Sequence, residues 1–283
     1  MNDSISHHPS ICAVILTKDE EKNLPRCIAS LKWCSKIIIL DSGSTDRTCE
    51  VASSLKVQVV THIPSQPFLI SEQRNWILDH DDLQTEWVLF LDADEEIPAD
   101  LASEIQRLCS QTDSAYNAYE LTPRYLFWDR WLKRTQGYPN WHPRLLKRGE
   151  VKFCGGVWEH FDKNARVGRI LIPYNHYANS KGIADWIIRH NRYSSWDADI
   201  AFQYLQTGQE TSLLTQRKKF LRKCAAQLWP FRPFARFIQM YFLRLGFIEG
   251  IPALVLCVMY AVYEFMVVVK IAELRRLHYH KNL

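Results

Sequence analysis

The chain has 283 residues, of which 47% are hydrophobic, and a formal net charge of +4. This length and apolar content support a large buried core with an appendage, which excludes a disordered chain. So small a charge gives no argument for binding nucleic acid, and the chain contains no recognisable nucleic-acid-binding module, so we expect no nucleic-acid partner.

The N-terminus and the cysteines indicate a cytoplasmic protein. The opening residues, MNDSISHHPS, lack the basic and apolar regions of a secretory signal, so residues 1–10 are predicted to form a polar tail. The eight cysteines occur singly, without a C-x-x-C pair or a Cys/His cluster at metal-ligand spacing. This pattern is typical of small buried thiols in a reducing compartment.

The first hundred residues alternate between strand and helix patterns. ICAVILT (11–17) is a continuous apolar run, and apolar residues then recur at i, i+3, i+4 and i+7 from Leu24. KIIIL leads to a helix at about residues 45–55, VQVVTH to a helix around SEQRNWIL, and EWVLFL to a helix after Pro98. Short strand–helix links predict an α/β fold with a mostly parallel sheet and helices on both faces.

Polar clusters follow three of these strands: TKDEE (17–21), DSGSTD (41–46) and DADEE (92–96). Ligands of parallel sheets bind outside the carboxyl ends of the strands, so the three turns should meet at one crevice. Crowded carboxylates resist desolvation unless something positive lies among them. A solvated strand-to-helix turn is the alternative, but the convergence of three turns favours a binding site.

Asp92 and Asp94 form a D-x-D pattern whose hard oxygens suit Mg²⁺ or Mn²⁺ together with diphosphate oxygens and water. Asp41 ends the second strand, where its carboxylate can accept a hydrogen bond from a planar base. A structural Asx turn with a helix cap at Ser44 or Asp46 is the alternative for this segment. The glycine patterns of dinucleotide-binding and P-loop sites are absent.

From Tyr116 onward the predicted strands are shorter than those of the first hundred residues. Strands rich in Trp, Tyr and Gly are expected between Tyr116 and Tyr177, as an antiparallel or mixed extension of the sheet. A helix is expected from Gly182 to about Gln206.

Four segments in order, AVILTKDEEKNLPRCIASL, IIILDSGSTDRT, QRNWIL and WVLFLDADEEIP, resemble the donor half of family 2 glycosyltransferases, which are inverting enzymes with the GT-A fold. The resemblance covers roughly residues 10–205, and FRPFARFIQMYFLRLGFIEG extends it towards a branch that includes lipopolysaccharide-core beta-glucosyltransferases. It implies a GT-A domain over residues 11–210, with a nucleotide-sugar-binding half (11–112) and an acceptor half (113–210).

The resemblance implies a nucleoside pocket lined by Thr17 and Glu20, with Asp41 recognising the base, typically uracil, and Ser42 and Gly43 in the same nucleotide-sugar-binding turn.

Around the diphosphate, the resemblance places Arg74 close by, Asp92 on the ribose or in the metal shell, and Asp94 as the direct metal ligand. A solvated helix cation is the alternative for Arg74. His176 could complete the metal shell, and a structural histidine is its alternative. Trp141, His142 and Arg144 could line the sugar site, although aromatic packing explains the tryptophan equally well.

Inverting transfer needs one carboxylate to deprotonate the acceptor hydroxyl while a metal absorbs the charge of the leaving diphosphate. The candidate is Glu159 in GGVWEHF, with a structural salt bridge as the alternative. The related branch usually reads His-Glu here, whereas this chain reads Trp158-Glu159-His160. Glu95 and Glu96 are weaker candidates for the base.

Residues 211–283 are predicted to form a helical tail. From Arg217 the tail mixes basic and aromatic residues, as in helices that lie in a lipid interface. IPALVLCVMYAVYEFMVVV is long enough to raise a transmembrane span, but Glu264 within it would cost about 2.5–3.5 kcal/mol near mid-bilayer. We predict an interfacial helical pair; a full span, a helical lid and a dimer contact are the alternatives.

Together these features predict a metal-dependent inverting hexosyltransferase that uses Mg²⁺ or Mn²⁺ at the inner face of the plasma membrane. The nucleotide-sugar donor is UDP-glucose or a similar compound, and the acceptor is a lipid-linked or lipopolysaccharide-core saccharide. The alternatives are a transferase acting on another envelope polysaccharide, a lipid carrier or a protein, and a non-catalytic nucleotide-sugar-binding membrane scaffold.

Overall fold

The structure, a computed structural model, describes residues 9–64, 69–81, 83–155, 159–207 and 229–281. It divides into two compact units, the first made of residues 1–126 and 138–180 and the second of residues 127–137 and 181–283. The predicted boundary at residue 210 falls outside the described residues and stays a prediction.

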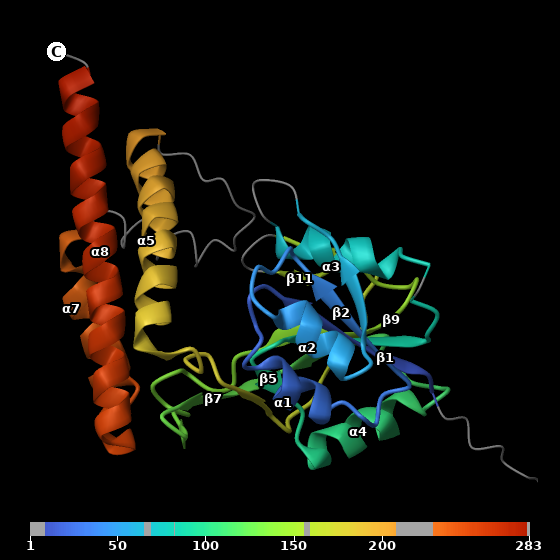
Figure 1. The fold of residues 1–283 in the computed structure, drawn as a ribbon. Helices are drawn as coiled ribbons and strands as arrows, with labels where there is room; N and C mark the ends of the chain where they lie inside the picture. Colours follow the sequence, from blue (N-terminus) through green and yellow to red (C-terminus); the bar gives the residue numbers. More distant parts are fainter. Residues whose placement is uncertain (1–8, 65–68, 82, 156–158, 208–228, 282–283) are drawn as a thin grey trace, which may run out of the picture. The chain divides into compact units, whose positions relative to one another are not determined.

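A seven-stranded sheet forms the centre of the first unit (Figure 1). Its strands β3, β2, β1 and β4 are mutually parallel, and β9 joins β4 to β6 through antiparallel pairs. The predicted α/β class with a mostly parallel sheet is therefore confirmed. In spatial order the strands are β12 (Val167–Arg169), β6 (Ala118–Leu121), β9 (His142–Lys147), β4 (Trp87–Asp92), β1 (Ile11–Thr17), β2 (Lys36–Asp41) and β3 (Gln58–Thr61).

Apolar side chains fill both faces of this sheet, which explains the continuous apolar runs in the sequence. Alternate residues of β1 enter different cores: Ala13 and Ile15 lie in one cluster, and Cys12 and Val14 in the other. The helices α1 (Leu24–Ala29), α2 (Thr48–Ser54) and α4 (Ala99–Cys109) contribute to the first cluster, and α3 (Ile70–Leu78) contributes to the second.

The cysteines follow this packing only in part. Four of the seven described cysteines are buried, whereas Cys154 is exposed, so the expectation of buried thiols is wrong at that position.

Short strands extend the unit, as predicted between residues 116 and 177. Strand β13 (Tyr174–His176) pairs in antiparallel fashion with β5 (Glu95–Glu96) and in parallel with β7 (Pro123–Phe127). The pairing sets His176 opposite Glu95. A separate two-stranded sheet of β10 (Phe153–Cys154) and β11 (His160–Phe161) closes the loop that carries Glu159.

The second unit is mainly helical. Its two long helices, α5 and α8, lie side by side, with α7 next to α8 (Figure 1). The predicted helix from Gly182 to about Gln206 is confirmed by α5. The elements are β8 (Arg130–Trp131), α5 (Gly182–Thr207), the 3₁₀ turns η1 (Trp229–Phe231) and η3 (Gly246–Glu249), α7 (Arg232–Phe237), the π-helical turn η2 (Ile238–Leu243) and α8 (Ile251–Lys281).

A buried carboxylate fixes the start of α8. Glu249 accepts hydrogen bonds from the backbone N–H groups of Arg134 and Thr135 at 2.7 and 2.8 Å. Gly250 follows with a φ of 78°, a conformation that favours glycine, and α8 begins at the next residue. The basic segment from Arg217 to residue 228 lies outside the described residues.

Candidate functional site

Strand register brings the three polar turns to one edge of the sheet. In the parallel pairs, Thr17 lies opposite Asp41 and Leu16 lies opposite Asp92. The predicted convergence of the turns is therefore confirmed, since all three follow strands that end at the same level.

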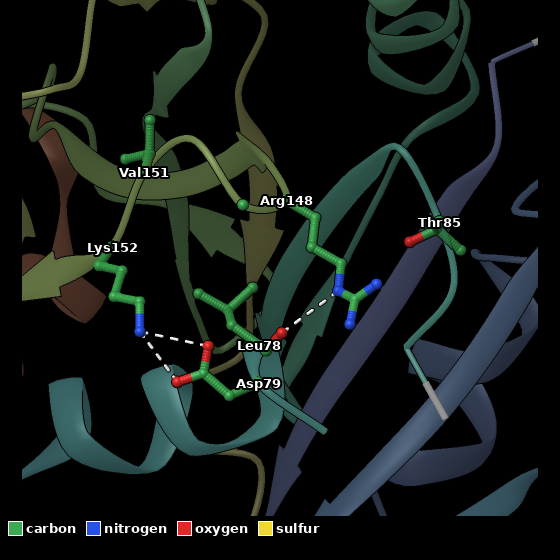
Figure 2. A pocket seen from close by; sticks show the side chains of 7 residues that line it. Leu78, Asp79, Thr85, Arg148, Val151 and Lys152 are labelled. Carbon is green, nitrogen blue, oxygen red and sulfur yellow. Dashed lines mark hydrogen bonds and ion pairs between the residues drawn. The ribbon is translucent and has the colours of Figure 1, made fainter. Parts of the chain in front are cut away.

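Two hollows of the first unit lie away from this edge. Among the described residues, a cavity of about 330 Å³ is lined by residues that flank the amino end of β4, and it is drawn in Figure 2. Its charged groups are paired locally: Lys152 Nζ lies 2.9 Å from an oxygen of Asp79, and Arg148 donates to the carbonyl of Leu78. A second hollow, of about 450 Å³, lies beside the amino end of β1. Neither contains a residue that the sequence assigned to the site.

The Asp41 carboxylate shapes the turn after β2. It accepts hydrogen bonds from the Thr17 hydroxyl at 3.0 Å, from the backbone N–H groups of Gly43 and Ser44 at 2.9 and 2.8 Å, and from the Ser44 hydroxyl. Burial alone would raise the pKa of Asp41, but these donors hold it below its usual value. A carboxylate can accept about four hydrogen bonds, and these four donors provide them. The segment therefore forms the structural Asx turn that was the alternative to a binding site. Recognition of a base by Asp41 stays a prediction.

The turn after β1 is joined to the turn after β2. The Asp19 N–H donates to the Ser44 hydroxyl at 2.9 Å, and the Thr45 N–H donates to the Asp19 carboxylate at 2.7 Å. Glu20 accepts a hydrogen bond from the Asn23 amide at 2.7 Å, at the start of α1. The two turns thus form one hydrogen-bonded rim, and the predicted contact of Glu20 with a nucleoside stays a prediction.

A buried charge cluster lies where β4 ends. Arg144 Nη2 is 2.6 Å from Glu95 Oε1 and 3.0 Å from Asp92 Oδ2, and Arg74 Nη2 is 3.6 Å from Asp92 Oδ1. Glu95 is fully buried, and its other oxygen accepts the Asp92 N–H at 3.0 Å. Burial raises the pKa of Glu95 to about 7. Although burial acts in the same direction on Asp92, the two guanidinium groups lower its pKa to about 2.

Asp94 and His176 lie beside this cluster. His176 Nε2 is 3.4 Å from Asp94 Oδ2, and both side chains are partly exposed. Burial alone would lower the pKa of His176, but the Asp94 carboxylate raises it to about 9.

The described residues contain no group of three or more His, Cys, Asp and Glu side chains arranged to hold a metal ion. The spacing of Asp94 and His176 nevertheless suits two ligands of one cation, if phosphate and water oxygens complete the shell as they commonly do for Mg²⁺. Asp92 differs, because each of its oxygens faces a guanidinium group. The residues present therefore fit a cation with Asp94 and His176 as its protein ligands.

Arg74 joins the charge cluster to the predicted base. Its side chain is fully buried, so the alternative of a solvated helix cation is wrong. Arg74 Nη1 lies 2.6 Å from Glu159 Oε1, while Glu159 Oε2 is buried without a hydrogen-bond partner. Burial raises the pKa of Glu159. The salt bridge foreseen as an alternative for Glu159 is present, and the role of base stays a prediction. Trp158, which precedes it, lies outside the described residues.

The neighbours of Arg74 on α3 make two further connections. The Gln73 amide donates to the Ser42 hydroxyl at 2.6 Å. The Asn75 side chain donates to the Phe153 carbonyl and accepts from the Phe153 N–H, both at 2.8 Å. Three consecutive residues of one helix thus hold the turn after β2, the end of β4 and the strand before Glu159.

Sequence reasoning assigned no role to Gln73 or Asn75. The sequence contains no signal for these roles, because three consecutive helical residues span only about 200° and can all lie on the solvent side of a helix whose apolar face is about 100° wide.

The remaining candidates make structural contacts. Glu96 accepts a hydrogen bond from the Tyr177 hydroxyl at 2.6 Å. Trp141 lies under the Arg169 guanidinium, whose carbon is 4.9 Å from the ring centre. Burial, together with the Arg144 charge, lowers the pKa of His142 to about 3, so its ring is neutral.

Comparison with known proteins gives four findings. The sequence profile of Glycosyl transferase family 2 matches residues 12–166. An uncharacterized glycosyltransferase of Rickettsia typhi is 26% identical over 284 residues, which cover 93% of this chain and 87% of that protein. The lipopolysaccharide core biosynthesis glycosyltransferase LpsC of Rhizobium meliloti is 22% identical, and the match covers 96% of both chains. Among solved structures, residues 1–349 of S. aureus TarS align over 94% of this chain and 91% of that one, with 13% identity and a TM-score of 0.43.

Proposed function

Since the chain belongs to glycosyl transferase family 2 and has a mixed α/β fold of the GT-A kind, we propose that it is an inverting hexosyltransferase that uses a nucleotide-sugar donor. The observation that carries the proposal is the arrangement around α3. One turn of this helix contacts the loop after β2, the carboxylates at the end of β4 and the carboxylate of Glu159.

The donor lies along the shared strand edge in this proposal. The rim formed by the turns after β1 and β2 takes the nucleoside, with Ser42 and Gly43 offering backbone to its ribose or base. Arg74 and Arg144 give the adjoining surface two buried positive charges, which favour an anionic diphosphate next to them. Asp92 is held between these guanidinium groups, and in this proposal it contacts the ribose.

Asp94 and His176 would hold a Mg²⁺ or Mn²⁺ ion beside the diphosphate. When bound, this ion supplies the positive charge that stabilises the leaving nucleoside diphosphate. Asp94 has the hard oxygen that both ions prefer, and the His176 imidazole is an accepted ligand of Mn²⁺.

Glu159 acts as the base. Its Oε1 is fixed by Arg74, which leaves Oε2 to take the proton of the acceptor hydroxyl. The acceptor oxygen attacks the anomeric carbon as the bond to the diphosphate breaks, so the new bond forms on the opposite face and the configuration inverts. The proton ends on Glu159, and no covalent sugar–enzyme bond is formed.

The acceptor proposed is a lipopolysaccharide-core or other lipid-linked saccharide, with UDP-glucose or a similar compound as the donor. Support for this acceptor comes from the likeness to LpsC, which extends over 96% of both chains and therefore includes the helical unit. Such an acceptor is anchored in a bilayer, so we place the enzyme at the cytoplasmic surface of the membrane.

Calorimetry of UDP binding tests the donor site. We expect Mn²⁺ to strengthen UDP binding to the unaltered chain, and we expect Asp94→Ala to lose this response. Asp113→Ala, which removes an exposed carboxylate in a turn, is the matched control and should behave like the unaltered chain. An Asp94→Ala variant with a full Mn²⁺ response would contradict the assignment.

Glu159→Gln tests the base. Glutamine keeps the size of the side chain but cannot take a proton, so the variant should bind UDP normally and lose sugar transfer. Transfer is measured as nucleotide release over a panel of nucleotide-sugar donors with a saccharide acceptor. An active Glu159→Gln variant would remove this residue from the mechanism and leave the rest of the proposal standing.

A further inference from the structure

Exposed apolar residues gather in the helical unit. Of the 28 large hydrophobic residues that are exposed among the described residues, 23 belong to the second unit. Soluble monomers rarely expose apolar patches larger than a few hundred Å², and larger ones mark interaction surfaces. This concentration indicates that the helical unit contacts an apolar partner.

Six of the exposed apolar residues of α8, between Ile251 and Val269, form one stripe. They are spaced three or four residues apart, which places them on one side of the helix, and their exposure ranges from 38 to 72%. The stripe extends over 18 residue steps, or about 27 Å at 1.5 Å per residue. The α8 stripe consists of Ile251, Leu254, Val258, Val262, Phe265 and Val269. Phe242, Leu243, Phe247 and Ile248 add exposed apolar side chains just before it.

Glu264 lies on the opposite side of α8. It is buried, like Leu256 and Val267 on the same side, and two arginines of α7 contact its carboxylate. Arg232 Nε lies 2.7 Å from Oε2 and Arg236 Nη2 lies 2.9 Å from Oε1. Glu264, which argued in the sequence against a transmembrane span, therefore leaves the stripe uninterrupted.

Helix α5 determines how α8 can meet a membrane. The two helices run together, because Trp186 contacts Tyr260 with ring centres 6.3 Å apart, and Ala198 packs in one cluster with Val267. The later part of α8 is thus accompanied by α5 along its length.

Charged side chains of α5 exclude a crossing of the bilayer by this pair. Arg192 and Asp199 are exposed on α5. If α8 spanned the membrane with α5 packed on it, these two charges would enter the hydrocarbon core, which is strongly unfavourable. The helix is long and apolar enough to span by composition alone, but its packed neighbour is not.

We propose that α8 lies in the plane of an anionic lipid bilayer, with the α8 stripe facing the acyl chains. Two exposed arginines, Arg275 and Arg276, follow the stripe and would meet anionic head groups. This complementarity favours a bilayer over a second copy of the chain as the partner. The apolar stripe of a second copy would offer no negative charge to the two arginines. The inference deepens the membrane location in the proposed function and uses none of the sugar-transfer chemistry.

Flotation of the full chain with lipid vesicles tests the surface. The variant Val258→Gln/Val262→Gln/Phe265→Gln should bind mixed phosphatidylcholine–phosphatidylglycerol vesicles at least tenfold more weakly than the unaltered chain, because it places three amides in the stripe. Leu55→Gln/Leu171→Gln, which changes two exposed leucines of the first unit, should float as the unaltered chain does.

Arg275→Gln/Arg276→Gln should lose about fivefold per arginine on the mixed vesicles and nothing on pure phosphatidylcholine. An unchanged affinity of the stripe variant would overturn the proposal, provided that its circular dichroism matches that of the unaltered chain. If the stripe variant loses self-association in sedimentation but keeps its flotation, the α8 stripe binds a second copy of the chain. This result would also overturn the proposal.

Protease digestion of sealed vesicles that carry the chain on their outer surface separates the in-plane from the spanning arrangement. An in-plane helix keeps both of its ends accessible to the protease, and protection of the residues at one end of α8 would refute the in-plane arrangement. Asp94→Ala should float normally although it loses the Mn²⁺ response of UDP binding. Failure of the surface proposal and failure of the proposed reaction therefore give different results.

Discussion

Arg144 should contribute more to stability than any surface arginine of the first unit. It is nearly buried and lies within 3.0 Å of two carboxylates, those of Glu95 and Asp92. Arg144→Met keeps the apolar stem but leaves both carboxylates without this partner. Removing one member of a buried ion pair costs about 3–5 kcal/mol, which corresponds to a fall of roughly 6–20 °C in Tm for a unit of this size.

Urea unfolding followed by tryptophan fluorescence measures the effect. Arg169→Met is the matched control, because Arg169 forms an exposed ion pair with Glu120 at 3.0 Å and should cost about 0–1 kcal/mol. Adding Glu95→Gln to Arg144→Met should restore at least about 1 kcal/mol, since glutamine removes an unpaired buried charge and can still accept the Asp92 N–H. A loss below 1 kcal/mol for Arg144→Met, or a further loss in the double variant, would refute this account of the cluster.

Three further outcomes are expected. Hydrogen bonds lower the pKa of Asp41 in the folded chain, so its stabilising effect is present above its unfolded pKa of about 3.9 and disappears as pH falls through the folded value. Asp41→Asn should therefore lower Tm at pH 7 and lose less stability than the unaltered chain between pH 5 and pH 3; parallel curves would contradict this. Asn75→Ala removes both hydrogen bonds to Phe153, which should cost about 1–3 kcal/mol and reduce transfer without weakening UDP binding; unchanged turnover would count against a role in placing Glu159. Gly168→Ala should cost about 1–3 kcal/mol, because a Cβ there would lie 2.6 Å from the Tyr119 ring, and a Tm within 1 °C of the unaltered chain would show that the ring moves freely.

The central sheet was predictable because its strands are buried on both faces. Strand β1 is a run of seven residues without a charged side chain, and its alternate residues enter the two cores. Parallel topology then places the ends of β1, β2 and β4 together, which is why three separate polar turns could be assigned to one site.

The contacts inside the site could not be predicted in the same way. Glu95 and Arg144 are 49 positions apart, and nothing in either segment's periodicity indicates that one neutralises the other. Asp41 illustrates a second difficulty, because local hydroxyl and amide groups compete with any ligand for the oxygens of a carboxylate, and only coordinates show which donors are close enough.

Helix α3 has a consequence for the coupling between donor and acceptor binding. Gln73 contacts the turn after β2 and Asn75 contacts the strand before Glu159, and both belong to the same helical turn. A donor that draws the loop after β2 towards itself should therefore also shift the acceptor side, and thermodynamic reciprocity requires the acceptor to strengthen donor binding by the same factor. Such a helix makes a lower apparent Kd for each substrate in the presence of the other the expected behaviour of this transferase.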